Sequence, residues 1–143
     1  ESSAASDVYK RQWLSWTNRG HQPNQLPSTE ALSKAVDFSI QANVECTLIN
    51  CSHADVASNS IRELARTPKF GIFANSSTFK EIDLSISTKD IDAIHHLNSE
   101  IISAKEYAKI ALNWAKKGAY VVGGCCGTTV EHTKQIKLLL ETL

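Results

Sequence analysis

The chain has 143 residues and a mass of 15.7 kDa, the size of one domain or of part of one. Its 15 Lys and Arg balance its 15 Asp and Glu, so it lacks the cationic excess of nucleic-acid-binding proteins and of basic membrane-surface patches. No apolar run reaches the ~20 residues that span a bilayer, and no secretory leader pattern is visible, so we expect a cytoplasmic globular protein without nucleic-acid or membrane partners.

The first residues do not resemble the rest of the chain. Residues 7–12 read Asp-Val-Tyr-Lys-Arg-Gln, which resembles the in-frame translation of a sequencing-library adapter. We therefore expect residues 1–12 to be an adapter-derived segment or a disordered terminus. The folded domain is expected to occupy residues 13–143.

From Trp13 onward, short apolar runs alternate with longer helical patterns. The apolar runs predict four strands, over residues 13–17, 46–49, 70–74 and 119–122. The helical patterns predict four helices, over residues 29–43, 54–66, 103–118 and from 128 onward. For residues 75–102 we expect a loop beginning at Asn75 and a polar helix around 89–98.

Two of the helices carry a capping-box motif at their start. Ser103-x-x-Glu106 predicts the beginning of the third helix, and Gly118 is a suitable left-handed residue at its end. Thr128-x-x-Glu131 predicts the beginning of the last helix.

Alternation of strands and helices favours an α/β fold with parallel strands and right-handed crossovers. Four such units fill residues 13–143 at about 33 residues each, close to the ~31 per unit of an eight-unit (βα)8 TIM barrel. The spacing therefore predicts half a barrel, with a complete open α/β sheet as the alternative. An isolated half would expose two strand edges, which favour aggregation or self-association.

Three of the four cysteines follow predicted strands, where a barrel has its active-site face. Cys125 and Cys126 lie in a Gly-Gly-Cys-Cys-Gly segment between the last strand and the last helix, and Cys51 follows the second strand. Three thiolates with one open position are typical of catalytic zinc. The alternative for Cys125 and Cys126 is a tight turn that contains two small apolar residues. The alternative for Cys51 is a small buried residue that binds no metal. This spacing is not that of a secreted disulfide protein, and it favours a reducing compartment.

Several motifs together resemble the homocysteine S-methyltransferase family over residues 13–143. They are Trp13-Leu14-Ser15-Trp16-Thr17, Asn50-Cys51, Ala74-Asn75-Ser76, Glu106-Tyr107-x-x-x-Ala111-x-x-Trp114, and Gly123-Gly124-Cys125-Cys126-Gly127-Thr128-Thr129 with Glu131-His132.

The resemblance implies a zinc-dependent enzyme built on a (βα)8 barrel, of which this chain is the C-terminal half (its last four βα units). Cys51, Cys125 and Cys126 are then expected to hold Zn²⁺. The implied reaction transfers a methyl group from a small donor to the thiol of homocysteine and gives methionine. S-methylmethionine, S-adenosylmethionine, betaine and a corrinoid all remain open as donors.

Other residues near the strand ends are candidates for lesser roles. Asn50, Asn75 and Gly124 are expected to contact substrate, with loop hydrogen bonding as the alternative for the two asparagines. His53 is expected to be an ordinary loop histidine, with a hydrogen-bonding neighbour of the metal ligands or an alternative metal ligand as the other interpretations.

The remaining cysteine, histidines and tryptophans favour structural roles. Cys46 is predicted to lie in the core, on the sheet face opposite to Cys51. His132 is expected to cap or pack, and His95-His96 to be solvated. Trp13 and Trp16 are expected to pack in the core, with a place lining the barrel mouth as the alternative.

Two other functions stay open. The chain could be a homocysteine- and zinc-binding module of a larger methionine synthase, or a structural fragment without catalysis. In each case we expect it to need the N-terminal half-barrel or self-association.

Overall fold

The structure is a computed structural model that describes residues 12–79 and 99–143. Residues 1–11 of the expected adapter-derived segment lie outside the described residues, as do the polar helix expected around 89–98 and His95-His96. Within the described ranges, no helix is both long enough and apolar enough to cross a membrane.

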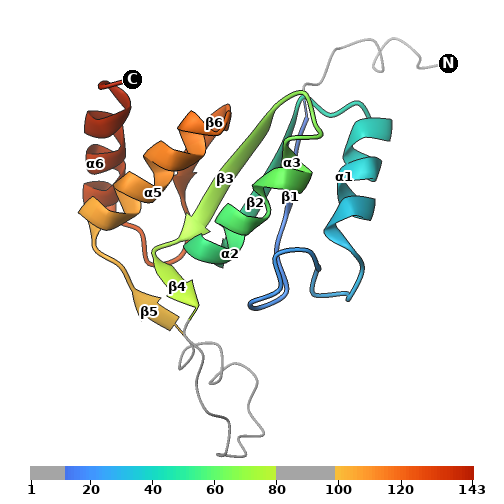
Figure 1. Ribbon diagram of the computed structural model, residues 1–143, viewed down its shortest axis with the longest axis horizontal. Coiled ribbons are helices and arrows are strands. Elements are labelled where there is room, and N and C mark those ends of the chain that lie inside the picture. Colours follow the sequence, from blue (N-terminus) through green and yellow to red (C-terminus); the bar gives the residue numbers. More distant parts are fainter. Residues whose placement is uncertain (1–11, 80–98) are drawn as a thin grey trace, which may run out of the picture.

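The centre of the molecule is a parallel sheet of four strands in the order β1-β2-β3-β6 (Figure 1). These strands are β1 (Trp13–Trp16), β2 (Cys46–His53), β3 (Phe70–Asn75) and β6 (Val121–Gly124). Each is parallel to its neighbour, which confirms the predicted α/β fold. β2 continues four residues beyond its predicted end, and β6 begins two residues later than expected.

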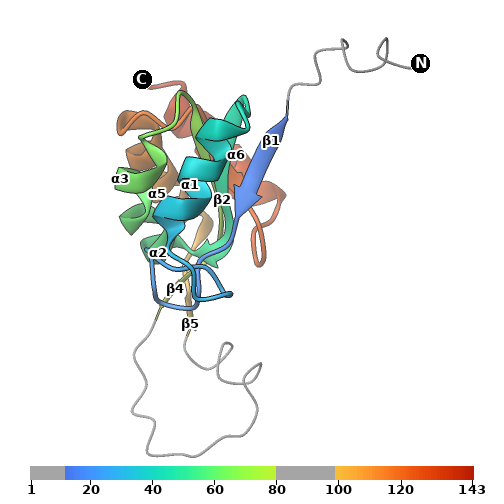
Figure 2. The same ribbon diagram turned by 90° about the vertical axis from the view of Figure 1, so that its right-hand side faces the viewer.

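Helices connect the strands and cover the sheet, with α1, α2 and α3 on one side of β1 and β2 (Figure 2). The five described helices are α1 (Leu32–Gln41), α2 (Ala54–Asn59), α3 (Ile61–Leu64), α5 (Ala104–Lys116) and α6 (Val130–Leu140). The helix predicted over residues 54–66 is divided at Ser60, whose hydroxyl oxygen lies 2.8 Å from Pro23 O and 3.2 Å from Val56 O, within reach of either carbonyl as acceptor. Such bonds compete with regular helical pairing.

The hydrophobic core lies between the helices and one face of the sheet. Trp16, Ile49, Ile72 and Val122 occupy matching positions on the four strands and face the helices. Trp16 is part-buried there and donates from Nε1 to Ser39 Oγ at 3.1 Å. Its predicted packing against the core is confirmed.

The alternate positions of the strands form the other face of the sheet. Trp13 lies on this face and is 49% exposed, so the prediction that it belongs to the core is wrong. The reason is its place on β1, an edge strand of the described sheet, where Cys46 of β2 is its one neighbour among the described residues. Cys46 is fully buried, as predicted.

The two predicted capping boxes have different outcomes. Ser103 and Glu106 form the expected reciprocal hydrogen bonds at the start of α5. The box predicted at Thr128 and Glu131 is wrong, because the N-cap of α6 is Thr129 and His132 takes the third helical position.

The capping shift at α6 has a local cause. The Thr128 hydroxyl donates to the carbonyl of Cys125 at 2.7 Å, so it belongs to the preceding turn and not to the helix. Nδ1 of His132 accepts instead from the backbone N–H of Thr129 at 3.1 Å. The capping role expected for His132 is confirmed.

A small antiparallel pair follows β3 and was not predicted. It consists of β4 (Ser77–Phe79) and β5 (Ser99–Ile101), in a stretch expected to be a loop. Phe79 donates its backbone N–H to Asp55 at the start of α2, which ties the pair to the main body.

Candidate metal centre

Cys51 is turned out of the regular strand pattern by its own backbone. It has φ 49°, and the pairing of β2 with β3 changes register between Asn50 and His53. A left-handed residue at a bulge redirects the side chains that follow. The alternation that predicted opposite faces for Cys46 and Cys51 therefore does not extend to Cys51.

Asn50 lies directly before this bulge and contacts the sulfur of Cys51. Its Nδ2 is 3.8 Å from Cys51 Sγ, and its Oδ1 accepts from the Thr17 hydroxyl at 3.1 Å. An amide held in this way stabilises negative charge on the neighbouring sulfur. Asn50 of β2 thus places its amide beside the Cys51 sulfur, and Thr17 at the end of β1 holds that amide in position.

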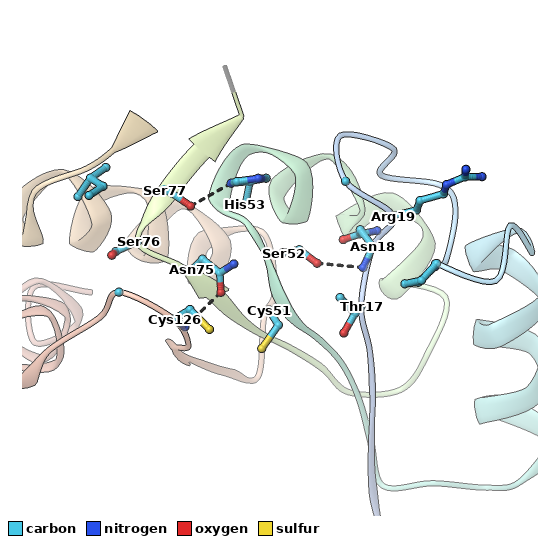
Figure 3. Close-up of a pocket in the computed structure, with 14 residues that line it drawn as sticks. Thr17, Asn18, Arg19, Cys51, Ser52, His53, Asn75, Ser76, Ser77 and Cys126 are labelled. Carbon is cyan, nitrogen blue, oxygen red and sulfur yellow. Dashed lines mark hydrogen bonds between the residues drawn. The ribbon is translucent and has the colours of Figure 1, made fainter. Parts of the chain in front are cut away.

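The Cys125–Cys126 turn is held by the end of β3. The backbone N–H of Cys125 donates to Ala74 O at 2.8 Å, and that of Cys126 donates to Asn75 Oδ1 at 3.1 Å. Ser76 N donates back to Cys126 O at 3.0 Å. Figure 3 shows the Asn75–Cys126 bond, which connects two segments far apart in the sequence.

Two glycines of the Gly-Gly-Cys-Cys-Gly segment are required by this geometry. Gly127 has φ +76°, and a Cβ there would lie 2.5 Å from Ser76 Oγ. At Gly124 a Cβ would collide with the side chain of Thr128. Glycine avoids both problems because it has no Cβ. Close packing of the turn therefore accounts for glycine at positions 124 and 127.

The structure brings together the three cysteines that were predicted to share a site. Their sulfur atoms lie within 4.8 Å of one another. Cys51 and Cys125 are joined as a disulfide with a Cα–Cα distance of 5.6 Å, a pairing that their spacing in the sequence did not predict. Cys126 is a free, exposed thiol. On reduction the cluster offers three thiol groups to one ion.

A pocket of about 690 Å³ opens beside the cluster (Figure 3). Cys51, Cys126 and Asn75 line it, whereas Asn50 and Gly124 are not among its described lining residues. Further lining residues were not predicted as site residues: Thr17, Asn18, Arg19, Gly20, Pro27, Ser52, Ser76, Ser77, Ile101 and Gly127. Residues 17–20 and 76–77 follow β1 and β3, and Ser52 lies near the end of β2. Position at a strand end is the sequence signal that could have identified them.

Hydrogen bonds between neighbouring segments hold the walls of this pocket in place. Asn18 donates its backbone N–H to Ser52 Oγ at 2.9 Å, and Nδ1 of His53 lies 2.9 Å from Ser77 Oγ (Figure 3). His53 is buried and its ring is 6.0 Å from that of Phe79. Among the described lining residues there is no carboxylate, and Arg19 brings a positive charge to the rim.

The fourth cysteine is separate from the cluster. Burial raises the pKa of the Cys46 thiol, although the nearby positive charge of Lys69 acts in the opposite direction. A buried thiol with a raised pKa is a poor metal ligand and nucleophile at neutral pH. This environment agrees with the structural role predicted for Cys46.

Comparison with known proteins decides the family. The model of the homocysteine S-methyltransferase family matches residues 1–140, nearly the whole chain. The chain belongs to the homocysteine S-methyltransferase family. The predicted resemblance is confirmed.

Relatives of this homocysteine S-methyltransferase family member include homocysteine S-methyltransferase 1 of Brassica oleracea var. italica. The two are 26% identical over 127 residues, which make up 87% of this chain and 36% of the relative. The chain thus spans little more than a third of the length of that relative.

Solved structures of the homocysteine methyltransferase MmuM from Escherichia coli are similar in fold. The oxidized form gives a TM-score of 0.61 at 20% identity, covering 94% of this chain and 38% of MmuM. The apo form gives 0.62 at 19% identity, covering 94% and 42%.

Proposed function

We propose that this chain carries the zinc site and part of the homocysteine pocket of a zinc-dependent homocysteine S-methyltransferase. The reaction would transfer a methyl group from a small donor to homocysteine and give methionine. The observation that carries this proposal is the clustering of the Cys51, Cys125 and Cys126 sulfurs within 4.8 Å at the edge of a pocket. Membership of the family supports the same assignment.

The donor set fits zinc on chemical grounds. Soft thiolates favour Zn²⁺ over Mg²⁺ or Ca²⁺, and three protein ligands leave one position for a substrate. Bound there, zinc would hold the homocysteine thiol and lower its pKa, which favours the nucleophilic thiolate. Cys126 is exposed and lines the pocket, so a metal held by the three thiols would lie beside the space that substrate enters.

The protein's own groups would then position the reactants. Asn50 would stabilise the charge on Cys51 through its amide, and Asn75 would hold Cys126 in place. We propose that Asn50, Asn75 and Gly124 also contribute to substrate binding. For Asn75 this is supported by its place in the pocket wall.

The chemical balance of the step is simple. The homocysteine sulfur forms a bond to the methyl carbon while the bond from that carbon to the donor breaks. The thiol proton would leave to solvent through the pocket, because the described lining contains no carboxylate that could accept the proton.

A thiol cluster of this kind needs reducing conditions, which supports a cytoplasmic location.

We further propose that the chain is the C-terminal half of a (βα)8 barrel, namely its last four βα units. This is supported by four parallel strands in sequential order and by coverage of 36–42% of the relatives. In the described sheet β1 and β6 are both edge strands, and unpaired edges invite further strands. The partner would be the N-terminal half-barrel or a second copy.

Light scattering on the purified chain tests the half-barrel proposal. We expect dimers or larger assemblies, because open edges and an uncovered sheet face associate in water. A monomer that unfolds cooperatively would contradict the proposal and favour a complete small α/β domain.

Zinc content tests the metal site most directly. The chain should be purified under reducing conditions, since the Cys51–Cys125 disulfide removes two of the three thiols. Elemental mass spectrometry should then find about one zinc per chain or per assembled pair. Folded, reduced protein without zinc would overturn the proposal. Protein that binds zinc should next be titrated with homocysteine by calorimetry.

A further inference from the structure

Tyr107 connects the two strands that carry the cysteine turn. Its side chain is fully buried on α5, and its hydroxyl lies 2.7 Å from Ala74 O and 2.8 Å from Gly123 O. These carbonyls belong to neighbouring strands, β3 and β6 (Figure 1). Ala74 O also accepts the backbone N–H of Cys125 at 2.8 Å. One hydroxyl therefore reaches both strands at the point where the candidate metal centre begins.

The regular pairing of the two strands stops at the same place. The last matched pair of β3 and β6 is Ala74 with Gly124. Beyond it, the chains are held by the bonds of the turn itself. Gly123 and Gly124 contribute no side chains that could pack across this junction. A hydrogen-bond donor from a neighbouring helix therefore acts where the regular pairing of β3 with β6 ends.

The hydrogen bonds of the Tyr107 hydroxyl can be removed by substitution while the packing of the ring is kept. The ring packs edge-on against Trp114 and His132, with centroid distances of 5.7 and 5.6 Å, and phenylalanine would keep both contacts. Burial raises the pKa of Tyr107, so the group stays a protonated donor at neutral pH. Its single proton is shared between the two carbonyls in a three-centre hydrogen bond, since the two oxygens lie at nearly equal distances from the hydroxyl.

We propose that Tyr107 is a positioning residue for the metal centre: its hydroxyl holds the ends of β3 and β6 together and so keeps Cys125 and Cys126 beside Cys51. The inference rests on the proposed function, because it assigns to this turn the task of binding zinc. Tyr107 itself does not contact substrate or metal in this role. It acts through the backbone of the turn.

The test compares Tyr107→Phe with Ser58→Ala. Ser58 Oγ accepts from Nε1 of Trp114 at 2.7 Å, so its replacement also removes a hydrogen bond to α5, but away from the strand ends. Zinc affinity is measured by chelator competition, and the ligand geometry by the thiolate-to-cobalt absorption of the Co²⁺-loaded protein. We expect Tyr107→Phe to weaken zinc binding about tenfold and to alter the cobalt spectrum, with Ser58→Ala close to wild type.

Amide hydrogen exchange of the reduced, metal-free protein gives a second readout. Exchange at Cys125 and Cys126 should be faster in Tyr107→Phe than in Ser58→Ala, relative to the rest of the sheet. Equal effects of the two variants on affinity and exchange would overturn the inference, as would a Tyr107→Phe chain that fails to fold. A wild-type chain that binds no zinc would overturn the proposed function, while the exchange comparison still decides the role of Tyr107.

Discussion

The two cysteine-bearing turns of the candidate metal centre are held in different ways. Cys51 owes its direction to its own backbone, with φ 49° at a bulge within β2. The Cys125–Cys126 turn is held from outside, by Ala74 and Asn75 of β3. A left-handed non-glycine residue costs about 1–2 kcal/mol, which the surrounding contacts must offset. One side of the centre is therefore set locally, and the other depends on a neighbouring strand.

This difference indicates which substitutions should affect the centre. Changes in β3 should reach Cys126 through hydrogen bonds, although β3 supplies none of the three sulfurs. The Cys51 side should respond mainly to changes at the bulge and at Asn50, whose amide contacts the sulfur. Four experiments test or refine this comparison.

The largest effect is expected from removal of the sulfurs themselves. Cys51→Ser, Cys125→Ser and Cys126→Ser should each sharply lower the zinc bound per chain, because three thiolates share the ion. Cys46→Ser is the control, since that thiol is buried away from the cluster. Elemental analysis of the four variants decides the question. An equal loss in all four would contradict the assignment of the site.

A smaller effect is expected from the strand that supports the turn. Asn75→Ala removes the acceptor for the backbone N–H of Cys126 and should weaken zinc binding about tenfold. Ser77→Ala is the control, because Ser77 lines the same pocket but bonds to His53. Chelator competition should leave the affinity of this control near wild type. If the Asn75 variant also binds normally, β3 does not hold the turn as described.

Substitutions at two glycines, one in the cysteine turn and one outside it, distinguish an effect on the stability of the fold from an effect on zinc binding by the turn. Gly118 and Gly127 both have positive φ, so replacing either by alanine should lower the free energy of unfolding by about 1–3 kcal/mol. A Cβ at Gly118 meets only Phe70 at 3.8 Å, whereas one at Gly127 would press on Ser76. Denaturant unfolding should therefore show both losses, and only Gly127→Ala should also reduce zinc content. Reduced zinc content in Gly118→Ala would argue for a general effect of instability.

The smallest effect concerns the capping box of α5, whose hydrogen bonds join Ser103 and Glu106 and do not involve either turn. Hydrogen bonds from the Ser103 side chain and backbone lower the pKa of the Glu106 carboxyl below its ordinary value of 4.5. A lowered folded-state pKa stabilises the protein above pH 4.5, and this contribution is lost as the pH falls through the folded-state value. Glu106→Gln should thus unfold with a weaker dependence on acid pH, measured by denaturant melts at pH 3 and pH 7. Zinc content at pH 7 should not change.

Much of the fold followed from local patterns. The four main strands and the four helices predicted outside residues 75–102 appear near their predicted positions, one of those helices divided into α2 and α3, because apolar periodicity records which side of each segment is buried. The convergence of Cys51 with Cys125 and Cys126 also followed, since the carboxyl ends of parallel strands share one edge. These inferences need only the order of elements and the direction of each strand.

Other features depended on contacts between distant segments. Thr128 was expected to cap α6, but its hydroxyl bonds to Cys125 O, and Thr129 caps the helix in its place. Trp13 was expected in the core, but the edge position of β1 leaves it exposed. For Thr128 a contact with the preceding turn decided between two possible caps, and for Trp13 the lack of a second described strand beside β1 decided its exposure.

The sequence by itself determined the alternating fold and the identity of the three clustered thiols, because both depend on residue type and spacing along one chain. Only the tertiary structure decided how those thiols are aimed: the register shift between β2 and β3 surrounds Cys51, and the Asn75 side chain and the Tyr107 hydroxyl hold the Cys125–Cys126 turn. The physical reason is that hydrogen bonds across a sheet join groups many residues apart. Their geometry exists only once the strands are packed side by side.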